Sequence, residues 1–139
     1  MRSKPLYHWA FNLSAMYILI AEDESRSAQL LNQLVRSFWS GPLEIATVGS
    51  VNETISATQV RQPDLLLLDI ELGGHSGFDA LEKIQHRQFP FVVISASKEY
   101  AFQTYQLGGS GYVLKPVSKE DLYAVLRRLP VFKGQAIEM

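Results

Sequence analysis

The sequence contains no cysteine, which excludes disulfide bonds, thiolate metal sites and cysteine nucleophiles. It has only three histidines and no HExxH motif, so a histidine-rich zinc site is not expected. No apolar run reaches the roughly 18–20 residues that a membrane-spanning helix needs, and we therefore expect no membrane segment. Neither sign of charge prevails: 13 basic and 14 acidic residues give a formal net charge of -1. This balance argues against nucleic-acid binding by this domain itself.

Apolar residues make up 47% of the 139 residues and aromatic residues 11%, which is enough for a packed core. On the usual scale of ~100–200 residues per domain, this length predicts a single domain. We expect residues 1–15 to be a poorly ordered leader, 16–130 to form the domain and 131–139 to be a tail without a pattern. A signal peptide is the less favoured interpretation of the leader, because His8 and Asn12 interrupt its apolar part.

From Met16 onward, short apolar runs alternate with segments of helical period, a pattern typical of βα units on a parallel sheet. The strongest strand signal is the range 64–70 (DLLLLDI), which is continuously apolar between two aspartates. A strand buried on both faces has this composition. Further strands are expected over the ranges 17–21, 44–48, 89–95 and 111–114.

Between these runs, apolar residues recur at helical spacing. We expect Ser25 to cap the first helix, which stops at Gly41-Pro42, and Ser118 to cap the last, with Asp121 at the spacing of a capping box. The glycines of the range 71–77 predict a loop before the third helix. The other helices are expected over 52–61, through Leu81 and Ile84, and over 99–107. Five βα units in succession predict an α/β fold, a doubly wound five-stranded parallel sheet.

In open parallel sheets, ligands bind beyond the carboxyl ends of the strands, so residues just after each apolar run are candidates for a site. Charged and hydroxyl residues follow four of the five runs. They are Glu22 and Asp23, Asp69, Ser95, and Lys115-Pro116. Asp69 is the most informative of these, because a carboxylate beside a buried strand is costly without a compensating partner.

Taken singly, each of these residues has an ordinary interpretation, such as complementing a helix N-terminus for Glu22 and Asp23. Together they indicate a site for a divalent metal and a phosphoryl group. Three carboxylates brought close repel one another unless a cation intervenes, and Mg²⁺ binds carboxylates while bridging to phosphate oxygens. Lys115 would supply a positive charge to a phosphoryl group on Asp69, and Ser95 a hydrogen bond.

This set of residues, in five βα units, resembles the receiver domain of two-component response regulators over residues 16–130. The resemblance implies a flavodoxin-like fold with the strand order 2-1-3-4-5. It also implies that Asp69 receives a phosphoryl group from a sensor histidine kinase, with Mg²⁺ as cofactor. The implied metal ligands are Glu22, Asp23, Asp69 and the backbone carbonyl of Glu71.

The resemblance assigns further roles near this centre. Ser95 would follow the phosphoryl group, Lys115 would pair with it, and Tyr112 would turn inward as an aromatic switch residue. The alternative for Tyr112 is an ordinary strand aromatic. The bond between Lys115 and Pro116 is a candidate for a cis peptide. Glu71 and Ser97, two residues beyond the phosphoacceptor and Ser95, are expected to tune the lifetime of the phosphoryl group.

The range 100–122 (YAFQTYQLGGSGYVLKPVSKEDL) is also similar to receivers attached to LytTR-type DNA-binding domains. Two features depart from the family pattern. The acidic pair is Glu-Asp where Asp-Asp is commoner, which lengthens the reach of Glu22 to a metal. The loop after Asp69 reads IELGGHSG without the frequent Met-Pro, which bears on where the backbone of Glu71 lies. Neither departure removes a charge, so we still expect phosphorylation.

The resemblance implies a cytoplasmic, bacterial-type switch that is not a turnover enzyme and loses its phosphoryl group by slow autodephosphorylation. The implied partners are a sensor histidine kinase, a downstream output domain or protein, and a second copy bound through the fourth helix, fifth strand and fifth helix. The nine residues after Pro130 are too few for a folded output domain. We therefore expect a protein that acts by docking to partners, or a piece of a longer regulator.

Three alternatives remain open at this point. The first is a receiver-like interaction module that works without phosphorylation and whose acidic pocket stabilises the fold. The second is a haloacid-dehalogenase-like phosphatase, although the segment Asp69-Ile70-Glu71 lacks the second aspartate of that class. The third is a flavin or dinucleotide site, which is disfavoured because the first strand-to-helix turn reads AEDES and has no glycine to cradle a phosphate.

Overall fold

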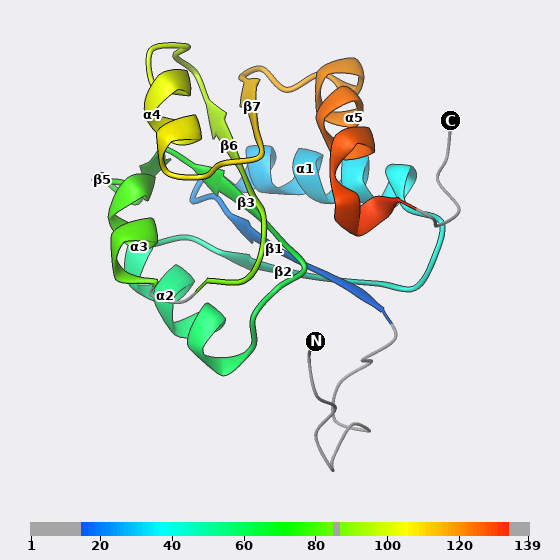
Figure 1. The fold of residues 1–139 in the computed structure, drawn as a ribbon, viewed down its shortest axis with the longest axis horizontal. Helices are drawn as coiled ribbons and strands as arrows, with labels where there is room; N and C mark the ends of the chain where they lie inside the picture. Colours follow the sequence, from blue (N-terminus) through cyan, green and yellow to red (C-terminus); the bar gives the residue numbers. More distant parts are fainter. Residues whose placement is uncertain (1–14, 85–86, 134–139) are drawn as a thin grey trace.

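The computed structural model describes residues 15–84 and 87–133, and the account below refers to these residues. Its sheet has five parallel strands (Figure 1). They are β1 (Met16–Ala21), β2 (Leu43–Val48), β3 (Leu65–Asp69), β6 (Phe91–Ser95) and β7 (Gly111–Leu114). The spatial order is β2-β1-β3-β6-β7. Counting only the strands of this sheet, the order is 2-1-3-4-5, which confirms the expected topology.

Helices cover both faces of the sheet. They are α1 (Ser25–Phe38), α2 (Val51–Val60), α3 (Gly77–Lys83), α4 (Ala101–Gln106) and α5 (Lys119–Arg128). In Figure 1, α1 and α5 lie together on one face, and α2 and α3 lie on the other. This is the doubly wound arrangement predicted from the βα alternation. Each helix in the described part of the chain is too short or too polar to span a bilayer.

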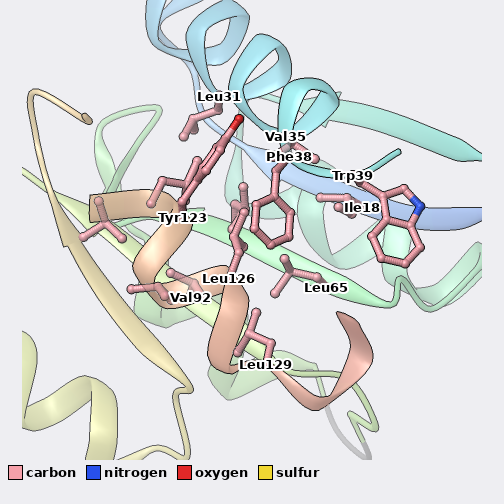
Figure 2. Packing of buried hydrophobic residues seen from close by; sticks show 14 of the residues in the cluster. Ile18, Leu31, Val35, Phe38, Trp39, Leu65, Val92, Tyr123, Leu126 and Leu129 are labelled. Atoms are coloured by element: carbon pink, nitrogen blue, oxygen red, sulfur yellow. The ribbon is translucent and has the colours of Figure 1, made fainter. Parts of the chain in front are cut away.

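The three central strands β1, β3 and β6 are almost entirely apolar because they pack against helices on both faces. On β1, Ile18 and Ile20 face the core formed with α1 and α5, while Leu19 faces the core on the opposite side. On β3, Leu67 and Leu66 divide between the two cores in the same way. Figure 2 shows the first of these cores, in which side chains of α1 and α5 meet over the sheet.

The helix ends are mostly as expected, with one error at α1. Ser118 caps α5, because its side chain accepts a hydrogen bond from the N–H of Asp121 at 3.1 Å. The prediction that Ser25 caps α1 was wrong. The cap is Glu24, whose carboxylate accepts the N–H groups of Arg26 at 3.1 Å and Ser27 at 3.0 Å. The glutamate side chain thus caps the helix, a role that serine more often has.

The segment after β3 is more ordered than the expected loop. Two-residue strands β4 (Glu71–Leu72) and β5 (His75–Ser76) pair in antiparallel orientation around Gly73 and Gly74. The helix α3 begins immediately afterwards at Gly77, capped by the side chain of Ser76. The glycines of this range therefore mark a tight hairpin and a helix start.

The sequence analysis missed a core residue near the end of the described chain. Pro130–Phe132 form a 3₁₀ turn, η2, and the side chain of Phe132 is fully buried. Its ring lies 5.2 Å from that of Phe38 and 5.3 Å from that of Trp39, measured between centroids. The packed structure thus continues past Pro130. Residues 1–14 and 134–139 lie outside the described residues, and they hold most of the expected leader (1–15) and most of the expected tail (131–139).

Candidate functional site

The candidate residues from the sequence all lie at one edge of the sheet. Parallel strands end together, so residues at or just after their carboxyl ends become neighbours although they are distant in sequence. Glu22 and Asp23 follow β1, Asp69 and Ser95 are the last residues of β3 and β6, and Lys115 follows β7. The structure therefore brings together the carboxylates, the hydroxyl and the ammonium group that the sequence pattern selected.

Three carboxylates form the centre of this site. One oxygen each from Glu22, Asp23 and Asp69 lies within 4.8 Å of the other two. Glu22 and Asp69 are only 3% and 4% exposed, whereas Asp23 faces solvent. Lys115 supplies the compensating charge, with Nζ 2.7 Å from Oε1 of Glu22 and 2.8 Å from Oδ2 of Asp69. One cation thus serves two buried carboxylates.

These contacts shift the protonation equilibria of the site. Burial of the carboxyl group raises the pKa of Glu22 to about 7, and its hydrogen bond with the carboxyl group of Asp69 adds to that rise. Lys115 and the N–H of Glu24 act in the opposite direction. Burial alone would lower the pKa of Lys115, but its bonds to Asp69 and Glu22 outweigh burial and raise it. The proximity of the two carboxyl groups thus favours the protonated form of Glu22, while Lys115 keeps its positive charge.

Both oxygens of Asp69 are held by the local backbone and by Lys115. Oδ1 accepts the N–H of Glu71 at 3.0 Å, and Oδ2 pairs with Lys115. Behind Asp69, the chain passes so close that a Cβ atom on Gly77 would lie 2.2 Å from the carbonyl oxygen of Asp69. Only glycine fits there. The sequence analysis missed this role, although the third glycine of the range 71–77, just before the expected helix, was a signal for it.

A second group of contacts links Ser95 to β7. The side-chain oxygen of Ser95 accepts the N–H of Ser97 at 3.0 Å, and the hydroxyl of Tyr112 donates to the carbonyl oxygen of Ser97. The backbone N–H of Lys115 donates to the carbonyl oxygen of Ser95 at 2.8 Å. The peptide bond between Lys115 and Pro116 is cis. Ser95, Ser97 and Tyr112 therefore form one connected set beside the carboxylates.

The chemistry of the donor set fits a hard divalent cation. All three clustered side chains offer carboxylate oxygens, the ligand type that Mg²⁺ prefers. Softer ligands are not among them, because the chain has no cysteine and His75 is exposed on β5. Glu22, Asp23 and Asp69 are therefore the side chains that could hold Mg²⁺, and Lys115 contacts two of them.

The model of one protein family, the response regulator receiver domain, matches residues 18–127 of the chain. The chain belongs to the response regulator receiver domain family. The match contains every strand of the sheet except the first two residues of β1, and it includes the whole cluster at the sheet edge. It confirms the family that the sequence pattern resembled.

Individual relatives agree with this assignment. The chain is 35% identical over 124 residues to the sensory transduction protein LytT of Enterococcus faecalis, covering 88% of this chain and 51% of that protein. It is 29% identical over 122 residues to the transcriptional regulatory protein LytR of Staphylococcus aureus, covering 86% and 49%. These similarities agree with the expected LytTR-associated subfamily. The chain spans about half the length of these two relatives.

Solved structures show the same fold. A DNA-binding response regulator of the LuxR family from Staphylococcus aureus superposes with a TM-score of 0.70 at 25% identity, covering 81% of this chain and 97% of that one. The receiver architecture thus extends beyond the LytT and LytR relatives.

Proposed function

We propose that this receiver domain accepts a phosphoryl group on Asp69 from a sensor histidine kinase in a Mg²⁺-dependent reaction. The observation that carries the proposal is the position of Lys115 Nζ, 2.8 Å from Oδ2 of Asp69, beside three carboxylates gathered within 4.8 Å. A nucleophilic carboxylate, a fixed cation and a set of metal ligands are the groups that phosphoryl transfer requires.

In the proposed reaction, a carboxylate oxygen of Asp69 forms a bond to the phosphorus of a phosphohistidine. The bond from phosphorus to the imidazole nitrogen breaks, and the imidazole keeps the electron pair and takes up a proton. The product on this chain is an aspartyl phosphate. Mg²⁺, when bound, supplies positive charge that offsets the charge of the phosphoryl oxygens. Lys115 would add a second positive charge beside Asp69.

The remaining residues of the site hold the reacting groups in place. Glu22 and Asp23 would hold the metal ion together with Asp69 and the backbone carbonyl of Glu71. The N–H of Glu71 orients the Asp69 carboxylate through its bond to Oδ1. Hydrolysis would return Asp69 to its free form slowly, so the domain is a switch with a limited lifetime. The exposed side chain of Glu71 and the half-buried Ser97 flank this centre and would tune that lifetime.

The contacts of Ser97 suggest how phosphorylation is transmitted. Its N–H binds the side chain of Ser95, while its carbonyl binds the hydroxyl of Tyr112. A phosphoryl oxygen that attracts the Ser95 hydroxyl would disturb the first contact and, through the same residue, the second. The side chain of Tyr112, on β7, would then change its orientation. This is a two-state element that a phosphoryl group can bias.

The surface next to Tyr112 is the proposed docking face for partners. Three large apolar side chains are exposed on α4 and β7. They are Phe102 at 74%, Tyr105 at 53% and Leu114 at 41%. Exposed apolar groups that lie close together are typical of protein contact sites. A downstream output domain or protein, or a second copy of the chain, would bind there after phosphorylation.

Phosphorylation can be tested with a small-molecule phosphodonor. Incubation with phosphoramidate and Mg²⁺ is expected to add one phosphoryl group to the parent protein, measured by intact mass, and none to Asp69→Asn. Asp79→Asn is the matched control, because Asp79 is an exposed aspartate in the first turn of α3. Size measurement on the same samples tests for a dimer. A parent protein without the adduct, or an adduct that survives Asp69→Asn, would contradict the proposal.

A further inference from the structure

The segment that carries Glu71 is a hairpin of defined geometry. Glu71 of β4 pairs with Ser76 of β5, and Leu72 pairs with His75. Gly73 and Gly74 form the two-residue turn between them, with φ values of 59° and 81°. Positive φ at both central residues is characteristic of the type I′ turn, which closes two-residue hairpins and fixes their register.

This register determines where the backbone groups of Glu71 point. In a hairpin closed by a two-residue turn, the residues that flank the turn are the hydrogen-bonded pair, here Leu72 and His75. The next pair, Glu71 and Ser76, is then non-hydrogen-bonded, so the N–H and C=O of Glu71 both point away from β5. The N–H reaches Oδ1 of Asp69 at 3.0 Å. The carbonyl of Glu71 therefore faces the same side as the Asp69 carboxylate.

Two contacts hold the hairpin in this orientation. The side chain of Leu72 is fully buried in the core on the α3 side of the sheet. At the turn, Gly73 approaches the β2–α2 connection so closely that a Cβ atom on it would lie 3.1 Å from the carbonyl oxygen of Gly49. Gly49 in turn lies beside Asp23, since a Cβ atom on Gly49 would lie 3.6 Å from the Cα of Asp23. The hairpin tip thus rests on the turn that borders another carboxylate of the site.

We propose that the Gly73–Gly74 hairpin is a positioning element for the metal site: it aims the Glu71 carbonyl at the carboxylate cluster and thereby sets the affinity for Mg²⁺. The inference rests on the proposed Mg²⁺ site. It explains how a segment without the Met-Pro common in this family can place a backbone ligand. Gly74 is the suitable position for a test, because a Cβ atom there would have no neighbour within 4 Å.

The experiment compares two substitutions at Gly74 that differ in their tolerance of positive φ. Valine is β-branched and strongly disfavours this conformation, whereas asparagine adopts it readily. Gly74→Val is expected to weaken Mg²⁺ binding roughly tenfold, as loss of ligand support does in other metal sites. Gly74→Asn is expected to stay within about twofold of the parent. The dissociation constants are measured by isothermal titration calorimetry, with hydrogen exchange of the Glu71 amide as a second measurement.

Gly108→Val is the matched control for backbone strain. Gly108 has a φ of 90° and also no neighbour within 4 Å of a Cβ atom, but it follows α4, away from the hairpin. We expect this variant to lose thermal stability without losing Mg²⁺ affinity. If Gly74→Val does not fold, Gly74→Ala replaces it with a smaller conformational penalty.

The possible outcomes separate this inference from the proposed function. A parent protein that binds no Mg²⁺ would refute the metal site and, with it, the role of the hairpin. A parent that binds Mg²⁺ while Gly74→Val and Gly74→Asn bind equally well would refute only the positioning role. Equal weakening in Gly74→Val and Gly108→Val would also refute it, since the effect would then be general destabilisation.

Discussion

The side-chain nitrogen of Lys115 lies 2.8 Å from Oδ2 of Asp69, a residue 46 positions earlier in the chain. The same nitrogen lies 2.7 Å from Oε1 of Glu22. Without this ammonium group, two buried carboxylates would face each other with no compensating charge. Lys115 is therefore the cation that compensates both carboxylates at this edge of the sheet, and Mg²⁺ at the proposed site would add a second one.

Lys115→Met tests this compensation. The variant keeps most of the apolar stem but leaves two buried acids without their partner, so we expect it to lose about 2–3 kcal/mol of unfolding free energy. This lies below the usual range for a fully buried pair because the Lys115 side chain is 24% exposed. Mg²⁺ is expected to restore part of the loss. Urea unfolding at pH 7.5 with and without Mg²⁺ measures both effects. Lys98→Met, at an exposed position, is the control.

Tyr112→Phe removes one hydroxyl and thereby the hydrogen bond to the carbonyl oxygen of Ser97. We expect a loss of about 0.5–1.5 kcal/mol in stability. Amide exchange should become faster in the loop after β6, because that carbonyl loses its partner. The control is Tyr105→Phe, since Tyr105 is 53% exposed on α4. Identical exchange in the loop of both variants would show that the Tyr112 hydroxyl does not restrain it.

Phe132→Ala tests whether the 3₁₀ turn η2 belongs to the core. The ring is fully buried against Phe38 and Trp39, so we expect a loss of about 3–5 kcal/mol, the usual cost of truncating a buried phenylalanine. Chemical denaturation measures the loss. The neighbouring exposed residue provides the control, Lys133→Ala, which should remain within about 0.5 kcal/mol of the parent. Equal stability of the two variants would show that η2 does not contribute to the stability of the folded core.

Glu24→Ala removes the N-cap of α1 and should lower the melting temperature. Glu24→Asn retains a capping oxygen and should preserve most of the stabilisation that the cap provides. The bonds from Ser27 and Arg26 hold the pKa of Glu24 below its usual value. The stabilisation from the charged cap is therefore complete above the ordinary glutamate pKa and is lost as the pH falls through the lowered one. Melting curves at neutral and acidic pH measure this. A difference between parent and Glu24→Ala that does not shrink in acid would contradict the assignment.

The sequence predicted the strands, and the residues that meet at the edge of the sheet, for a physical reason. Strands buried on both faces are continuous apolar runs, and residues that follow such runs meet at one edge, as Asp69 and Lys115 do. The strand order came from the family resemblance, because apolar periodicity carries no information on which strands are neighbours. The hairpin after Asp69 was missed since strands of two residues have no measurable period.

The other errors have equally local causes. Cap preferences favour serine over glutamate, so Ser25 was chosen although the longer side chain of Glu24 reaches the free N–H groups. Phe132 was missed because a single aromatic residue in a short segment forms no pattern. Its burial depends on the position of Phe38 and Trp39, which only the folded chain defines.

The helix α4 is the shortest of the five α-helices in the described part of the chain, with six residues. No side-chain hydrogen bond caps its N-terminus, and Thr104 is its one buried residue. A helix of this length has little stability of its own. Coupling between two equilibria is reciprocal, so a partner that prefers the phosphorylated arrangement of α4 would also shift the phosphorylation equilibrium of Asp69 toward the aspartyl phosphate. On the proposed function, an occupied docking face would therefore raise the fraction of phosphorylated protein at a given phosphodonor level, and the output partner would take part in setting the strength of its own signal.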